Sequence, residues 1–112
     1  MASIYLRHFN LKGSLSDSEV ASFWRLWREE VVPAIQKVSG VRSVKVYSGA
    51  GALRADLRLV VEMDHAGVYE IIIRDAGVGK VLGPVYGAID LTTSSQMFLR
   101  ELNPDLLRAL GA

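Results

Sequence analysis

The residues of this chain best suited to acid–base chemistry near neutral pH are its two histidines, His8 and His65. The chain has no cysteine, which excludes thiolate nucleophiles, disulfides and cysteine metal sites. His8 closes one strand-like segment and His65 follows another, so in an antiparallel sheet we expect them about a strand length apart. That separation argues against a shared metal site. His8 is therefore the candidate catalytic residue, although a single histidine on an apolar face is more commonly a hydrogen-bonded core residue.

Trp24 and Trp27 are three residues apart and could form an aromatic wall. They fall on the apolar stripe of a predicted helix, where large rings usually pack a core. We favour this core interpretation. The alternative is that one or both rings line a pocket between the helix and a sheet.

A further group of side chains alternates with the aliphatic residues of the predicted strands. It comprises Tyr5, Arg7, Phe9, Lys45, Tyr47, Asp56, Arg58, Val60 and Phe98. Buried charges need partners, and Asp56 could pair with Arg7 or Arg58, so we favour an ion-pair network across a dimer interface. The alternative is a small pocket for an anion, in which an arginine binds a carboxylate through two hydrogen bonds.

Several other chemistries are excluded by sequence. Residues 77–80, Gly-Val-Gly-Lys, do not form a phosphate loop, because Val81 replaces the required Ser or Thr and Arg74 replaces the first glycine. There is no Ser-His-Asp order, zinc-protease motif or paired-carboxylate pattern, and nothing predicts a resident cofactor or metal. Thirteen basic residues against twelve acidic ones predict neither a nucleic-acid nor a membrane partner. No stretch approaches the roughly 20 apolar residues that a membrane-spanning helix needs. The first residues do not resemble a secretory signal, so we expect a cytoplasmic protein.

The first half of the chain reads as strand, helix and strand. Residues 3–9 alternate between two faces, as a strand does. Ser16 and Glu19 form a capping box, which places a helix start near Asp17. The helix carries one apolar stripe, made of Val20, Phe23, Trp24, Trp27, Val31, Ala34, Ile35 and Val38. Pro33 lies off this stripe and is expected to bend the helix, and Gly40 is expected to end it.

From residue 41 on, the chain reads as two strands, a helix and a last strand. Residues 41–48 and 53–63 alternate and are joined by a hairpin loop at 49–51. Asp64 is a predicted N-cap for a helix from about residue 65 to 74. Residues 75–90 hold four glycines and Pro84, so we expect a helix fragment and a loop, either a plain connection or a flexible lid. A last strand is expected at 92–102, followed by a short helix capped by Asn103.

The order β-α-β-β-α-β predicts one α+β domain of ferredoxin-like fold over residues 1–112. Right-handed crossovers place the strands in the antiparallel order 4-1-3-2, with both helices on one face. We assign the aliphatic residues to that face and the mixed group above to the other, which a partner sheet, a nucleic acid or a ligand would cover. An RNA-recognition module is excluded because residues 53–59 lack stacking aromatics. A regulatory amino-acid-binding module remains open.

The first predicted helix and the turn after it resemble those of a known superfamily. Phe23 and Trp27, then Pro33, then Ser39-Gly40-Val41 leading into a strand resemble the dimeric α/β-barrel superfamily, nearest to EthD-like and antibiotic-biosynthesis-monooxygenase-like members. The resemblance implies a homodimer whose open sheet faces pack into one barrel. Members include cofactor-free monooxygenases, isomerases, cyclases and haem-degrading enzymes. EthD-like members often have a histidine before the proline of this helix, where this chain has Glu30-Val31-Val32-Pro33, so no catalytic residue is carried over.

Two functional hypotheses follow from the resemblance. The first is a cofactor-independent or haem-linked enzyme acting on a small aromatic or polyketide-like molecule. Its pocket would be lined by His8, Trp24, Trp27, and Tyr69 or Tyr86. The second is a non-catalytic homodimer that binds a small apolar or aromatic ligand or serves a structural role. Haem binding is left open, and the substrate and the reaction are not fixed by sequence.

Overall fold

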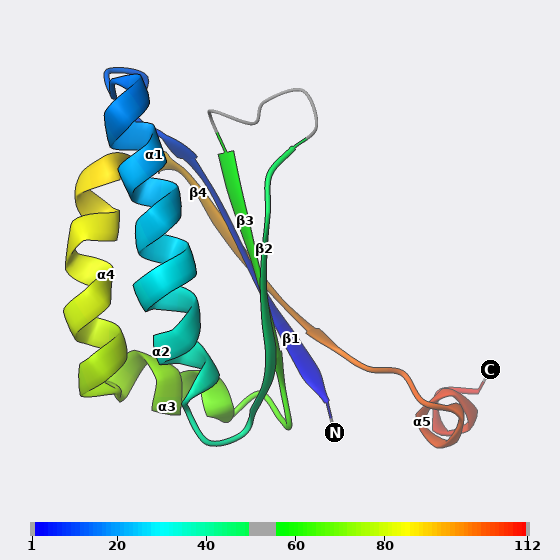
Figure 1. Cartoon of the computed structure of the whole chain (residues 1–112). Helices are drawn as coiled ribbons and strands as arrows, with labels where there is room; N and C mark the ends of the chain where they lie inside the picture. The colour runs from blue at the N-terminus through cyan, green and yellow to red at the C-terminus, as the bar shows by residue number, and fades with distance from the viewer. Residues whose placement is uncertain (1, 50–55, 112) are drawn as a thin grey trace.

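The computed structural model describes residues 2–49 and 56–111, which form one antiparallel sheet with the main helices packed on one face (Figure 1). The elements are β1 (Ser3–Leu11), α1 (Asp17–Leu26), η1 (Trp27–Val31), α2 (Val32–Gln36), β2 (Val41–Tyr47), β3 (Asp56–Met63), α3 (Val68–Arg74), α4 (Ala76–Ala88), β4 (Ile89–Arg100) and α5 (Pro104–Ala109). The predicted hairpin loop and the predicted start of the third strand lie mostly outside the described residues.

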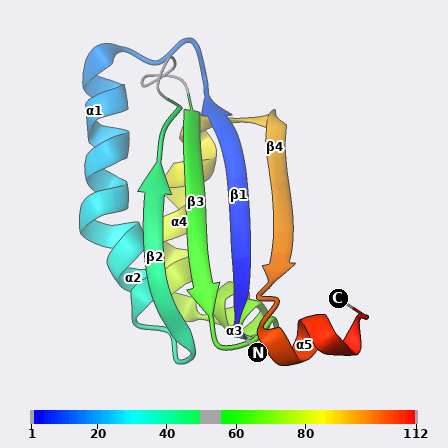
Figure 2. The same cartoon turned by 90° about the vertical axis from the view of Figure 1, so that its right-hand side faces the viewer.

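The four strands follow the order β2-β3-β1-β4, and each neighbouring pair is antiparallel (Figure 2). This is the predicted 4-1-3-2 order of the ferredoxin-like fold. Tyr5 of β1 lies opposite Val61 of β3 on one side and Phe98 of β4 on the other. The register therefore decides which side chains of the three strands share a face.

The predicted start of the first helix is confirmed. The Ser16 hydroxyl accepts a hydrogen bond from the Glu19 N–H at 3.2 Å, and the Glu19 carboxylate accepts one from the Ser16 N–H at 2.9 Å. This capping box satisfies two N–H groups that a helix start would otherwise leave unpaired. No helix of the described residues is long and apolar enough to cross a bilayer.

The helix continues through a π turn rather than through a simple bend. In η1 the Val32 N–H bonds to the Trp27 carbonyl, five residues back. The wide turn lies directly before Pro33, which has no N–H to give and whose ring collides with the carbonyl four residues earlier in a regular helix. Trp27 and Val31, the ends of the π turn, are both buried.

The helix ends at Gln36, earlier than predicted, and Gly40 serves the turn into β2 instead of the helix end. Gly40 has a φ of 93°, a left-handed conformation that other residues rarely adopt. A Cβ at this position would lie 2.6 Å from Cγ2 of Val68, at the start of α3. The glycine therefore allows the turn and α3 to pack closely.

Two predictions for the second crossover are wrong. Asp64 is not a helix cap: its carboxylate pairs with Nε of Arg42 at 2.7 Å, and α3 begins only at Val68. Residues 76–88 form the continuous helix α4, not a fragment and a loop. Asp75 caps this helix by accepting the Val78 N–H at 2.9 Å. Because Val78 and Val85 are buried on the sheet side, packing outweighs the low helix propensity of the glycines and Pro84.

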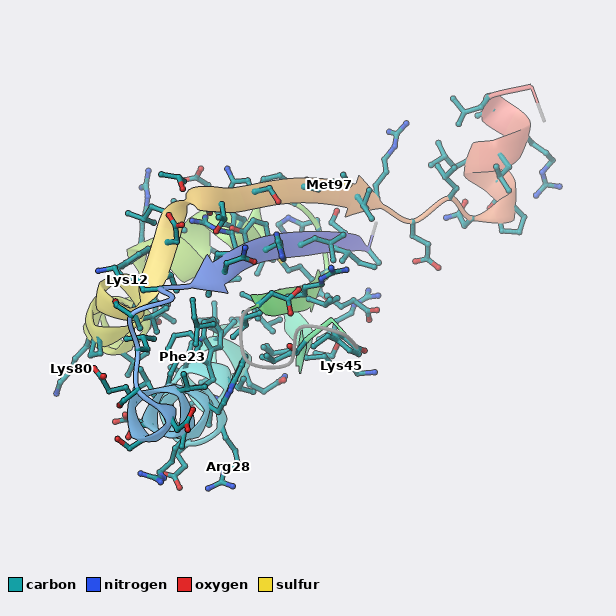
Figure 3. All side chains as sticks on the ribbon, turned by 90° about the horizontal axis from the view of Figure 1, so that it is seen from above. Lys12, Phe23, Arg28, Lys45, Lys80 and Met97 are labelled. Atoms are coloured by element: carbon teal, nitrogen blue, oxygen red, sulfur yellow. The ribbon has the colours of Figure 1, made fainter. Side chains whose placement is uncertain are left out.

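The prediction that Tyr5, Arg7, Phe9 and Phe98 face away from the helices is also wrong. Tyr5 and Phe9 are 6% and 3% exposed and belong to the core under the helices. Phe9 contacts Phe23 of α1 with ring centroids 6.4 Å apart, and Phe23 points from α1 toward the sheet (Figure 3). Both alternating sets of β1 are apolar enough to be buried, and the register places the aromatic set beside the buried residues of β3.

The opposite face of the sheet has no covering element among the described residues. It carries Ile4, Leu6, His8, Lys45, Tyr47, Arg58, Val60, Met97 and Leu99, which we call the open face. Met97 and Tyr47 are 56% and 51% exposed. α5, capped by Asn103 as predicted, projects away from the sheet on this side and stands apart from the other helices (Figures 1 and 3).

Candidate functional site

A partly enclosed cavity of about 90 Å³ lies between the sheet and the helix layer. It is lined by Tyr5, Arg7, Phe9, Trp27, Ile35, Leu59, Val61, Tyr69, Ile72, Ile73, Val78, Leu82, Val85, Tyr86 and Ile89. Its polar side chains come from β1 (Tyr5 and Arg7), η1 (Trp27), α3 (Tyr69) and α4 (Tyr86). Ile73 and Tyr86 are about half exposed and form its rim. An apolar cavity with a few polar groups is the usual form of a small-molecule site.

Two polar residues of the cavity wall, Tyr5 and Arg7, lie on β1 and are held by Gln96 of β4. The Tyr5 hydroxyl donates to Oε1 of Gln96 at 3.0 Å and accepts from Nη1 of Arg7 at 3.3 Å. Nη1 of Arg7 also donates to the same Gln96 oxygen at 3.3 Å. The arginine is thus held in place by two neutral groups, since Arg7 lies opposite Gln96 in the register.

Two buried N–H groups of the cavity residues have no hydrogen-bond partner within the part of the chain that the structure describes. They are Nε of Arg7 and Nε1 of Trp27. Both atoms are donors only. A buried donor without a partner costs about 1–3 kcal/mol, so each of these N–H groups calls for an acceptor such as a water or a ligand.

Tyr69 adds a third polar group to the wall. Its ring packs on Tyr5 at 4.8 Å and on Phe98 at 4.9 Å between centroids. Burial and the neighbouring Tyr5 raise the pKa of the Tyr69 hydroxyl above its usual value. The hydroxyl therefore stays protonated at neutral pH and keeps a proton to donate.

The predicted pocket residues separate into two groups. Trp27, Tyr69 and Tyr86 line the cavity together. Trp24 does not: its half-buried ring contacts Phe23 at 5.4 Å and borders a shallow recess over β2. Arg7 was expected on the other face, and the signal that places it in the cavity is its register opposite Leu59 of β3.

His8, the predicted catalytic residue, is not in the cavity but on the open face. Its Nε2 lies 3.5 Å from Oδ2 of Asp56. His65 lies at the other end of β3, where its Nδ1 accepts the Gly67 N–H at 3.1 Å, so the two histidines are apart as predicted. Among residues 2–49 and 56–111, no three His, Cys, Asp or Glu side chains are grouped to hold a metal ion.

Asp56 organises the end of the open face. Its carboxylate accepts from the Gly49 N–H at 2.7 Å and the Ser48 hydroxyl at 2.9 Å, and it pairs with Nε of Arg58 at 3.4 Å. The predicted pair with Arg58 is therefore present, whereas Arg7 lies on the other side of the sheet. The hydrogen bond from Gly49, the Ser48 hydroxyl and the Arg58 charge lower the pKa of Asp56, against the effect of its burial.

The lowered pKa of Asp56 predicts how stability depends on pH. A carboxyl group with a lower pKa in the folded state stabilises the fold above its unfolded pKa of about 3.9, and this contribution is lost as pH falls through the folded pKa. Asp56→Asn should lower the free energy of unfolding by about 1–3 kcal/mol at pH 7. In urea titrations, the difference from the parent chain should shrink below about pH 4. Asp105→Asn, on exposed α5, is the control and should show no such difference; a gap for Asp56→Asn that stays constant down to pH 2.5 would contradict the prediction.

Comparison with solved structures identifies the same fold. A protein of unknown function from Bacteroides fragilis, described as dimeric with a ferredoxin-like fold, superposes with a TM-score of 0.76 at 12% identity, covering 89% of this chain and 96% of that one. SnoaB from Streptomyces nogalater, a cofactor-independent oxygenase, gives 0.71 at 8% identity, covering 92% and 97%. A putative antibiotic biosynthesis monooxygenase from Nitrosomonas europaea gives 0.73 at 11% identity, covering 92% of each chain.

No protein-family model and no curated protein matches the sequence. At identities this low, structural similarity identifies the fold and leaves the activity open. The resemblance seen in the first helix is therefore confirmed for the fold. The chain has the fold of the dimeric ferredoxin-like proteins, which includes antibiotic biosynthesis monooxygenases.

Proposed function

We propose that this protein is a homodimeric enzyme that oxygenates a small, acidic, ring-containing molecule without a cofactor. The observation that carries the proposal is the partly enclosed cavity whose lining includes Trp27, a residue with a buried N–H that has no hydrogen-bond partner among the described residues. Such a group is suited to hydrogen-bond an oxygen of a bound molecule. The fold supports the proposal, because its structural neighbours include the cofactor-independent oxygenase SnoaB.

The lining of the cavity limits the chemistry. Its described residues include no histidine and no carboxylate to remove a proton, so the substrate must be acidic enough to ionise by itself. A substrate with a CH₂ group next to carbonyls meets this condition. Its carbanion can transfer electrons to dioxygen and form a C–O bond, and the resulting hydroperoxide loses water. The balance is R₂CH₂ + O₂ → R₂C=O + H₂O, in which carbon supplies all the electrons. The donors of Arg7 and Trp27 would stabilise the anion.

The size of the cavity limits the substrate. A cavity of about 150 Å³ is known to accept benzene, and this one has about 90 Å³. A single ring would enter with a small outward displacement of the rim, whereas a fused polycyclic molecule would require the helices to separate. We therefore favour a single-ring substrate over a polycyclic polyketide.

The second candidate is a non-catalytic ligand-binding dimer. The specific observation in its favour is the lack of a general base in the cavity, because His8 lies on the other face of the sheet. Both candidates use the same cavity and differ in whether oxygen is consumed.

The dimer is proposed from the open face. Met97 and Leu99 are 56% and 43% exposed, and they lie beside half-buried Leu6 and Ile4. A contiguous apolar face of this kind is normally covered by a partner, and two of the structural neighbours are described as dimeric. Light scattering should give twice the 12.3 kDa mass of one chain.

The enzyme proposal can be tested with phloroglucinol, a single-ring phenol whose keto form contains the required CH₂. The protein, treated with a chelator, should consume one O₂ per molecule and yield dihydroxybenzoquinone. Ile73→Trp places a large ring at the rim and should lower the rate about tenfold or more. Ile71→Trp is the matched control, because Ile71 is similarly exposed on the same helix but does not line the cavity.

The outcomes separate the two candidates. Oxygen uptake that Ile73→Trp suppresses and Ile71→Trp does not would support the enzyme. A rise in melting temperature with phloroglucinol but no oxygen uptake would overturn the enzyme proposal and support the binding dimer. If phloroglucinol causes neither oxygen uptake nor a rise in melting temperature, the enzyme proposal is overturned, and the binding dimer is overturned if the ligands of the next subsection also fail to bind.

A further inference from the structure

We infer that the ligand of the cavity is an organic carboxylate, and that Arg7 binds its carboxylate group. The inference rests on the proposed use of the cavity and adds the chemical class of the ligand. It follows from the charge of the cavity wall and from the buried donors of Arg7 and Trp27 that have no partner among the described residues.

Among the residues that the structure describes, Arg7 is the only charged one that lines the cavity. Its two hydrogen-bond partners, Tyr5 and Gln96, are neutral. The arginine forms no ion pair with a carboxylate among residues 2–49 and 56–111. By contrast, the buried carboxylate of Asp56 pairs with Arg58, and Asp64 pairs with Arg42. A partly buried guanidinium without a counter-ion is costly, so a bound anion would supply what the fold lacks.

The free atoms of Arg7 specify the kind of anion. Nη1 is used by Tyr5 and Gln96, whereas Nε is buried without a partner. Nε and Nη2 lie on the same edge of a guanidinium, and their two parallel N–H bonds match the two oxygens of a carboxylate. Nη2 forms no hydrogen bond with any residue that the structure describes. The edge that a carboxylate recognises is therefore the one without hydrogen bonds, and because protein atoms cover Nε in the unliganded fold, the guanidinium must shift to present this edge to a ligand.

The rest of the wall specifies the body of the ligand. Apart from Arg7, the polar side chains of the lining are Trp27, Tyr5, Tyr69 and Tyr86, and the others are aliphatic or Phe9. The buried N–H of Trp27 lacks an acceptor among the described residues, and a hydroxyl or keto oxygen on the ring would provide one. No acidic group of the lining could bind a cation. The ligand class is thus a single-ring carboxylate with an oxygen substituent.

The test compares two ligands of nearly the same shape, 3,5-dihydroxybenzoate and the neutral 3,5-dihydroxybenzamide. Calorimetric titration at pH 7 should show at least tenfold tighter binding of the carboxylate. Arg7→Gln should remove this preference and leave the affinity for the amide within about twofold. Arg74→Gln, which changes an exposed arginine of α3 outside the cavity, is the matched control and should keep the preference.

The two proposals fail in different ways. Equal binding of the two ligands by the parent chain would overturn the carboxylate inference and leave the cavity as a ligand site. A carboxylate preference that survives Arg7→Gln would also overturn it, because another cation would then hold the anion. Failure of both ligands, of phloroglucinol and of oxygen uptake would overturn the use of the cavity itself. The parent-chain comparison remains valid even if Arg7→Gln does not fold.

Discussion

Met97→Glu is expected to leave the chain folded and to convert the dimer into a monomer. Met97 is 56% exposed in the single chain, so a glutamate there costs the isolated fold little. In the proposed dimer the side chain would be buried between two sheets. The change removes about 1.5–3 kcal/mol of apolar burial and adds an unpaired buried carboxylate. Twofold symmetry places both effects in the interface twice, so the dissociation constant should rise by at least about 10³-fold.

Light scattering at 5–500 µM would measure this change, with circular dichroism to verify the fold. Ile71→Glu is the matched control: it introduces the same charge at a side chain that is 49% exposed, but on α3 and on the helix side of the sheet. This control should remain dimeric. If Met97→Glu forms the same dimer as the parent chain, the open face is not the interface.

Trp27→Ala is expected to destabilise the protein more than any other single truncation in the cavity wall. Trp27 is 3% exposed and packs against Phe9 and Phe23 at ring distances of 6.2 and 6.3 Å. Truncating a buried tryptophan to alanine removes about 3–5 kcal/mol from the free energy of unfolding. That is a large share of the 5–15 kcal/mol typical of a domain, and urea titration followed by circular dichroism would measure it.

Trp27→Phe separates the ring from its N–H. The phenyl ring keeps much of the packing, and losing an N–H that has no partner offsets part of the lost volume. Stability should change by less than about 1.5 kcal/mol, while ligand affinity falls about tenfold. Trp24→Phe makes the same change outside the cavity and should leave affinity unchanged. A Trp27→Phe variant that binds as tightly as the parent chain would remove Trp27 from the ligand site.

The sequence predicted correctly those structural features that depend only on residues close together in the chain. Ser16 and Glu19 are three residues apart, and their capping box depends on nothing outside that turn. The order of the strands followed from the order of the elements and the handedness of crossovers. Asp64 shows the limit of such signals. Its side chain could cap a helix, but in the structure it forms an ion pair with Arg42 of β2 instead.

The candidate site depended on long-range information that one sequence does not contain. β1 is apolar on both sides, since Ile4 and Leu6 alternate with Tyr5 and Phe9, and only its pairing with β3 decides which set meets the helices. The same pairing places the Arg7 side chain on the cavity side of the sheet and the His8 side chain on the open face. α4 was missed because its glycines and Pro84 disfavour a helix locally, and the burial of Val78 and Val85 outweighs them only in the assembled fold.

The π turn at η1 is, in effect, an insertion retained in the backbone. A regular helix turn would bond Val31, not Val32, to the Trp27 carbonyl, so the wide turn contains one residue more. Deleting one residue there would rotate everything that follows by about 100° relative to Trp27, and would move Ile35 out of the core. The proline and the additional residue therefore depend on each other, and the length of this helix is fixed more tightly than its composition.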